Sequence, residues 1–237
     1  MTNNYRIRFG TVGWQHPQWH GGFYPEDLPE EWLLPFYGNE FPVVAVPMSA
    51  WDAAPATLTA SWRDNSDAHF RFVFEWAWQG GADLRAFCQR LAPLRAQTLG
   101  ILLQVPWSVS AAADELRATL SEIATELPVS LEWRDADGQV LLTPDLGLAS
   151  CQALHTIYNV NSCWHGVEDN PAAFFADSAL ALTKLLDPSL PPRALRQVLE
   201  LCSAQIQYHR DTVVLFTGQP PPLQKVRDAM VMLELLA

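Results

Sequence analysis

The stretch YRIRFGTVGWQHPQWHGGFYP, residues 5–25, joins a strand pattern to a loop rich in glycine and aromatic side chains. Apolar and polar residues alternate over residues 5–10, which predicts a β-strand. The glycines, histidines and prolines that follow predict a loop that leaves the sheet. This loop carries more aromatic surface than a connection requires. It is therefore either a hydrophobic plug at one end of the fold or the lining of a ligand site, and the sequence leaves both open.

Strand and helix patterns alternate about eight times along the chain. Strands are expected at 41–46, 70–74, 100–104, 129–133, 179–183 and 212–216, and helices at 29–40, 53–63, 84–91, 116–127, 195–206 and 222–236. The pattern is weak over 135–171, where it indicates only a helix at 146–154 and a strand at 156–160. Because parallel strands need crossover helices, the alternation predicts an α/β fold, a single TIM-like (β/α)8 barrel domain over residues 1–237. A doubly wound open sheet is the alternative, although its dinucleotide-binding form lacks the GxGxxG motif.

The net charge of −11, with only 15 lysine and arginine residues, excludes several classes of partner. Nucleic acid binding requires clustered positive charge, and a negative surface is repelled by anionic membranes. No apolar run approaches the roughly 20 residues of a spanning helix, and the N-terminus lacks the layout of a signal peptide. We expect a cytoplasmic protein that binds a small molecule, with no nucleic acid and no membrane as partner. The oligomeric state is left open.

The opening stretch also resembles the signature of the YecE-like family, catalogued as domain of unknown function 72. The resemblance rests on Gly10–Trp14, Trp19 and Gly22–Pro25, and continues with Phe70–Phe72, Leu103–Pro106, Glu132–Arg134 and Val213–Phe216. It covers nearly the whole chain. It implies a TIM-like barrel and no settled activity, since the family carries a fold without an assigned chemistry.

The chain also departs from that family's pattern at several strand ends. Residues 45–51 replace the family's Glu-x-Asn-x-x-Phe-Tyr, and Glu75 replaces a lysine on the third strand. Residues 216–218 replace a closing Phe-Asn-Asn, and residues 182–185 do not match the family's Arg-x-His-Gly. Gln104, Glu132 and Arg134 remain. The chain is therefore expected to be a divergent member whose family activity is altered or lost.

In a parallel barrel the carboxyl ends of all strands meet at one face, where ligands bind. The residues expected to line a shared concavity there are Trp14, Trp51, Trp76, Gln104 and Arg134 as ligand-binding groups, with Glu132 beside Arg134. Tryptophans gather at these strand ends, which favours an aromatic-lined mouth for a small polar or sugar-like molecule. Arg134 alternatively binds an anionic ligand, as guanidinium groups do. Trp133 is expected to point the other way, into the core.

Glu75 and Glu132 support an alternative function. Two carboxylates facing each other across a pocket can divide the acid and base roles of sugar-bond hydrolysis, so both are candidate catalytic residues. Their structural interpretation is that Glu132 pairs with a basic residue such as Arg134 or Lys184, while Glu75 is solvated at the rim. Whether the chain is an enzyme stays open, and a hydrolase is the favoured class if it is one.

Cysteine and histidine spacing predicts no metal site and no cofactor. Cys88, Cys151, Cys163 and Cys202 form no CxxC pair and are expected to be reduced thiols. Among the six histidines only His16 and His20 have a metal-site spacing, and they lie in a loop that contains proline rather than on a helix. The sequence also lacks a GxSxG nucleophile elbow and a phosphate-binding glycine loop.

Overall fold

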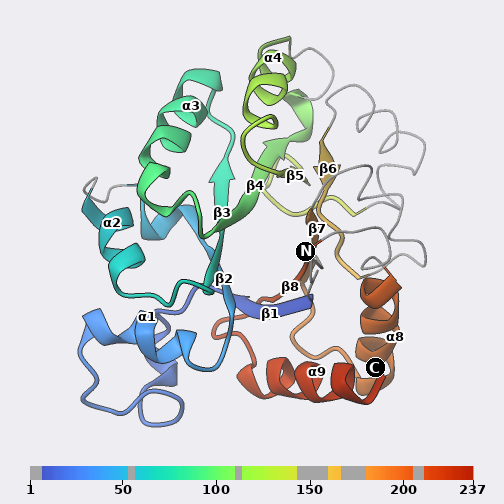
Figure 1. Ribbon diagram of the computed structural model, residues 1–237. Coiled ribbons are helices and arrows are strands. Elements are labelled where there is room, and N and C mark those ends of the chain that lie inside the picture. Colours follow the sequence, from blue (N-terminus) through green and yellow to red (C-terminus); the bar gives the residue numbers. More distant parts are fainter. Residues whose placement is uncertain are drawn as a thin grey trace, which may run out of the picture.

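The computed structural model describes residues 7–52, 57–109, 114–142, 160–166, 180–204 and 211–236. Its eight strands are all parallel and form one sheet in the order β6-β5-β4-β3-β2-β1-β8-β7 (Figure 1). They are β1 Ile7–Val12, β2 Val43–Val46, β3 Arg71–Ala77, β4 Thr98–Pro106, β5 Val129–Arg134, β6 Asn161–Ser162, β7 Leu180–Leu185 and β8 Asp211–Phe216. A parallel bridge between Trp164 and Thr183 connects the two edges of the sheet. The predicted TIM-like barrel is confirmed.

Six α-helices surround the sheet in the described part of the chain (Figure 1). They are α1 Glu30–Gly38, α2 Thr57–Asp64, α3 Gly81–Arg90, α4 Asp114–Ile123, α8 Pro192–Ser203 and α9 Leu223–Leu236, with short 3-10 turns at Pro17–Trp19, Met48–Ala50, Ala92–Leu94 and Trp107–Val109. Each overlaps a helix that the apolar periodicity of the sequence predicts, so the predicted crossover helices are confirmed. The helix expected at 146–154 lies outside the described residues, as does the strand expected at 156–160 except for Val160. Among the described residues, every helix is too short or too polar to cross a bilayer.

Strand alternation produces two separate hydrophobic cores. The core inside the barrel contains Val43, Ala45, Val73, Leu102, Cys163, Leu180, Leu182, Val213 and Leu215. The larger core fills the space between the sheet and the helices, and Trp133 lies in it, as expected for the residue between Glu132 and Arg134. Alternate side chains of one strand therefore point into the barrel or toward the helices. Only those that point into the barrel can reach a site inside it.

The loop after β1 divides between the two roles expected for it. Trp19 stacks on Tyr37 of α1, with ring centroids 6.3 Å apart and planes 9° apart. The Tyr24 hydroxyl donates a hydrogen bond of 2.7 Å to the carbonyl of Trp14. Trp19 and Tyr24 are buried and belong to the outer core, so this half of the loop is a hydrophobic plug. The half nearer β1 carries Trp14 and His16, which face a cavity described below.

Replacing Tyr37 with phenylalanine is expected to destabilise the fold by about 2 kcal/mol, because it leaves buried hydrogen-bonding groups without their partner. The Tyr37 hydroxyl accepts from the Thr11 amide at 2.9 Å and donates to the Val43 carbonyl at 3.1 Å, so it joins α1 to β1 and β2. Chemical denaturation measures the loss. A midpoint equal to that of the wild type would show that these bonds contribute nothing net.

Candidate functional site

A layer of charged side chains lies inside the barrel near the carboxyl ends of its strands. Glu75 comes from β3, Glu132 from β5 and Lys184 from β7, and each occupies an inward-facing position of its strand. All three are buried, with exposed fractions of 6%, 1% and 5%. Charges removed from water to this degree are stable only when they are paired.

Lys184 supplies the pairing for both carboxylates. Its Nζ lies 2.8 Å from Glu75 Oε1 and 3.2 Å from Glu132 Oε2. The two glutamates therefore converge on one ammonium instead of facing each other freely. Lys184 was expected at the end of its strand as one possible partner of Glu132, and its contact with Glu75 was not expected. Glu75 is buried in this pair and not solvated at the rim.

The electrostatic balance keeps Glu132 and Lys184 ionised. Burial raises the pKa of Glu132, but the neighbouring charges of Lys184, His165 and Arg134 outweigh it, so the pKa lies below its usual value. Burial lowers the pKa of Lys184, while Glu132 and Glu75 raise it by a larger amount, so the pKa lies above its usual value. Lys184 is thus an ammonium that donates hydrogen bonds rather than a free amine nucleophile.

Arg134 covers Glu132 from the cavity side. Its Nη2 donates to Glu132 Oε1, and its Nη1 donates to the carbonyl of Gly138 at 2.8 Å. Gly138 belongs to a tight turn after β5, in which Asp135 Oδ1 accepts from the amides of Asp137 and Gln139 at 2.9 and 2.8 Å. The positive φ of 77° at Gly138 suits glycine at this turn. The turn therefore fixes the guanidinium over the buried carboxylate.

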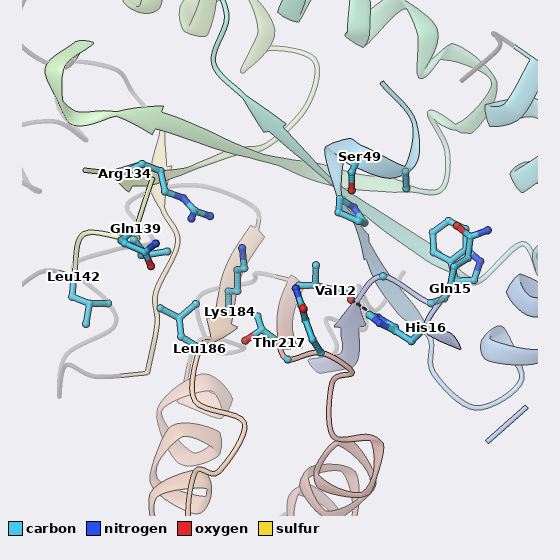
Figure 2. Close-up of a pocket in the computed structure, with 17 residues that line it drawn as sticks. Val12, Gln15, His16, Ser49, Arg134, Gln139, Leu142, Lys184, Leu186 and Thr217 are labelled. Carbon is cyan, nitrogen blue, oxygen red and sulfur yellow. Dashed lines mark hydrogen bonds between the residues drawn. The ribbon is translucent and has the colours of Figure 1, made fainter. Parts of the chain in front are cut away.

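A cavity of about 900 Å³ opens above this layer at the strand ends (Figure 2). Its described lining consists of Val12, Gly13, Trp14, Gln15, His16, Pro47, Ser49, Ala50, Arg134, Gln139, Val140, Leu142, Lys184, Leu186, Thr217, Gly218 and Gln219. In Figure 2 the guanidinium of Arg134 and the ammonium of Lys184 point toward the same space. No aspartate or glutamate is among these lining residues. The cavity thus presents two cations, several amides and hydroxyls, and an apolar wall.

His16 adds a neutral imidazole to the cavity wall. Its Nε2 lies 3.0 Å from the carbonyl of Val12, and because a carbonyl only accepts, this nitrogen carries the proton and donates. Burial lowers the pKa of His16 below its usual value, although the hydrogen bonds with the backbone oppose the shift. Gly13, at a φ of +75°, leaves room for the ring, since a Cβ there would lie 3.1 Å from His16 Nε2. The imidazole is therefore a neutral polar contact.

A second cavity of about 720 Å³ lies on the other side of Arg134. Gln104, Trp78, Trp107 and Asp135 contribute to its described lining, together with Arg134 itself. Arg134 is thus shared by both cavities. Gln104 reaches this second cavity and is not part of the described lining of the larger one.

The structure brings only some of the expected site residues together. Trp14 and Arg134 line the larger cavity, whereas Trp51 and Trp76 line neither described cavity. Trp51 and Trp76 stack on each other with centroids 4.8 Å apart, and both stack on Phe87 of α3. Trp76 points outward because Glu75, one position before it, points inward. These two tryptophans belong to the outer core.

The two catalytic candidates lie one layer below the cavity. Neither Glu75 nor Glu132 is among its described lining residues, and both are covered by the cations that pair with them. The arrangement offers a ligand the positive side of these pairs and keeps the negative side beneath. Chemically, it can bind and orient an anionic or polar group more readily than it can donate a proton from a carboxylic acid.

Cys163 and His165 complete this centre, and the sequence predicted Cys163 only as a reduced thiol. His165 Nδ1 lies 3.0 Å from the carbonyl of Lys184, and its Nε2 lies 3.8 Å from Glu132 Oε2. Cys163 and His165 are two residues apart on either side of Trp164, the same spacing that places Glu132 and Arg134 on one face around Trp133. That repeated x-Trp-x pattern is the signal that could have identified them.

The comparisons with known proteins agree with the fold. The model of the family described as "Protein of unknown function DUF72" matches residues 8–139. A DUF72 family protein from Thermotoga maritima MSB8 is 14% identical over 96% of this chain and 99% of that chain, with a TM-score of 0.71. One from Enterococcus faecalis V583 is 15% identical over 97% and 96%, with a TM-score of 0.67.

A more distant solved structure also shares the barrel. D-psicose 3-epimerase, crystallised in the presence of D-fructose, is 10% identical over 96% of this chain and 97% of that chain, with a TM-score of 0.55. At such identities the likeness shows the fold alone. A search of curated proteins finds no match to the chain.

Proposed function

Because the chain belongs to the DUF72 family of proteins of unknown function, its role has to be inferred from its own site, and we propose that it binds a small polar molecule carrying an anionic group. The ligand occupies the cavity of about 900 Å³ at the strand ends, a volume within the usual range for small-molecule sites. Its anionic group lies against Lys184 and Arg134, and its remaining polar groups face the amides and hydroxyls of the wall.

The observation that carries this proposal is the charge of the cavity. The chain has a net charge of −11, yet the described lining contains two cations and no acid. Lys184 Nζ and Arg134 Nη2 both donate to Glu132 Oε1, so the two cationic groups lie close together. Paired cationic donors of this kind are suited to carboxylate or phosphate oxygens.

The hydrolase alternative is less well supported by the same geometry. Hydrolysis by Glu75 and Glu132 would require one of them to donate a proton to a bound substrate. The lowered pKa of Glu132 keeps it ionised, and Lys184 occupies the space between the two carboxylates. We therefore infer binding without a retained family activity, in keeping with the replacement of the family's strand-three lysine by Glu75.

A thermal-shift screen with matched pairs of compounds tests the proposal. Each pair shares a skeleton and differs only in an anionic group, such as gluconate against glucose or glycerol phosphate against glycerol. At about 100 times its Kd, a ligand stabilises the native state by about 2.7 kcal/mol, which for a chain of this size raises Tm by roughly 5–10 °C. We expect anionic members to produce such shifts and their neutral counterparts to produce none.

A variant pair assigns the effect to the cavity. Arg134→Gln is expected to weaken the best anionic ligand by about tenfold or more in calorimetric titration, since it removes a charge-assisted hydrogen bond. Arg117→Gln is the matched control, because Arg117 lies exposed on α4 and pairs with Asp114 there. Equal shifts from neutral and anionic compounds, or an unchanged Kd in Arg134→Gln, would refute the proposed binding mode.

A further inference from the structure

Beside the ion pairs, the barrel interior contains three side chains with the donor atoms of a transition-metal site. One ligand atom from each of Glu132, Cys163 and His165 lies within 4.8 Å of the other two. All three residues are buried, with exposed fractions of 1%, 3% and 8%. None of them lines the cavity that carries the proposed function, so this cluster is a separate feature one layer below it.

The strand register explains why these residues meet. β5 pairs with β6 through Leu131 and Ser162, and the amide of Cys163 donates to the carbonyl of Leu131 at 2.7 Å. The next inward position on β5 is Glu132, which therefore lies beside Cys163. Glu132 lies in β5, whereas Cys163 and His165 follow β6 on either side of Trp164, whose bridge to Thr183 closes the sheet. Backbone hydrogen bonds from Cys163 to Leu131 and from Trp164 to Leu182 hold this segment in place.

Glu132 presents one oxygen to the cluster and uses the other for its partners. Its Oε1 accepts hydrogen bonds from Arg134 Nη2 and Lys184 Nζ. Its Oε2 has no exposed surface and accepts no hydrogen bond from the described residues, although Lys184 Nζ lies 3.2 Å away at ion-pair distance. Beside that ammonium, Oε2 therefore keeps acceptor capacity for a further donor or cation.

His165 is oriented toward that oxygen. A carbonyl only accepts, so the 3.0 Å contact with the carbonyl of Lys184 fixes the proton on Nδ1. Nε2 is then the nitrogen that faces Glu132 Oε2, at 3.8 Å. A histidine that donates one ring N–H to a backbone carbonyl and directs the other nitrogen to a metal is the usual outer-shell arrangement of protein metal sites.

We propose that Glu132, Cys163 and His165 bind a divalent transition-metal ion, for which zinc is the best match. Thiolate, imidazole and carboxylate are all zinc ligands, and three protein ligands with a further open position are typical of reactive zinc sites. Thiolate and carboxylate together balance the two charges of the ion. Lys184 then keeps Glu75 as its partner, at 2.8 Å.

The test is metal binding by the full chain after removal of metals with a chelator. Zinc is titrated in competition with a chromophoric chelator, and cobalt is titrated as a spectroscopic probe. We expect one zinc ion per chain and a cobalt complex with a thiolate charge-transfer absorption in the near ultraviolet. Cys163→Ser and His165→Gln should each weaken zinc binding by about 100-fold or more, since changes even to outer-shell partners cost 10–100-fold.

Matched controls separate this site from other thiols and imidazoles. Cys202→Ser removes another buried cysteine, which lies 3.6 Å from the Thr183 hydroxyl and outside the cluster, and His69→Gln removes an exposed imidazole. Both should bind zinc as the wild type does. If a site variant fails to fold, X-ray absorption at the zinc edge of the zinc-loaded wild type replaces it: the spectrum should contain one sulfur ligand.

Three results would overturn the proposal. The first is the absence of stoichiometric zinc binding. The second is a cobalt complex without thiolate absorption. The third is a zinc-edge spectrum that contains no sulfur ligand. The anion-binding proposal does not depend on these outcomes, because its readout is the response to paired compounds in the metal-free protein.

Discussion

Lys184→Met is expected to destabilise the protein by about 4 kcal/mol, because breaking a buried ion pair from one side leaves an uncompensated charge. Lys184 Nζ is the described partner of Glu75, at 2.8 Å, and one of two strong partners of Glu132. Methionine keeps the length of the side chain and removes only the ammonium. The denaturation midpoint in urea measures the change, provided that the slope of the transition stays the same.

A second substitution separates the charge from the packing. In Lys184→Met/Glu75→Gln the orphaned carboxylate is replaced by an amide, so part of the lost stability should return. Arg134→Leu alone should cost about 2 kcal/mol, typical of a lost charge-assisted hydrogen bond, because Glu132 keeps Lys184 as a counter-charge.

The surface provides the reference for these values. Arg117→Met breaks an ion pair between side chains that are 58% and 95% exposed, and should cost less than about 0.5 kcal/mol. A Lys184→Met midpoint as close to the wild type as that of Arg117→Met would show that the Glu75–Lys184–Glu132 cluster is hydrated in solution. The charge arrangement proposed for the cavity floor would then be wrong.

The fold could be predicted because its core signals are local. The apolar runs of β2 and β4 and the stripes of α4 and α8 follow from burial along each element, and all four appear where they were expected. The positions at which the strands end were predicted less accurately. β3 was expected to end at Phe74 and β7 at Thr183, yet the strands continue to Ala77 and Leu185.

Both extensions have one physical cause. Glu75 and Lys184 resemble solvated residues that end a strand, and each stays buried because the other neutralises it. They are 109 residues apart in sequence, so no local pattern reveals the pair. The short β6 is a similar case: it has two polar residues, and its Asn161 Nδ2 donates to the carbonyl of Leu180 at 2.9 Å.

The sequence predicted the end of the barrel at which the candidate site lies, but not which side chains point into it. Position at a strand end gives the correct face of the barrel, and Trp14, Gln104 and Arg134 do reach cavities there. The direction of each side chain depends on the alternation of inward and outward positions along its strand. The sequence analysis used this alternation to place Trp133 but not Trp76, which by the same rule points outward to Phe87.

Gly10→Ala is expected to destabilise the protein by about 3 kcal/mol or more, since inserting atoms into a filled space forces the backbone to shift. A Cβ on Gly10 would lie 1.9 Å from the carbonyl oxygen of Val43, far inside van der Waals contact. This oxygen also accepts the hydrogen bond from the Tyr37 hydroxyl, so β1 and β2 cannot separate without losing that bond.

Gly22→Ala is the matched control for Gly10→Ala. A Cβ on Gly22 has only the carbonyl oxygen of Trp19 within 4 Å, at 3.9 Å, and its φ lies outside the range that favours glycine. Alanine there should be neutral or stabilise the protein by about 0.4–1 kcal/mol, because it restricts the unfolded chain. Equal midpoints for the two variants would show that β1 and β2 tolerate a side chain between them. The close approach of the two strands would then not explain why a glycine stands inside β1.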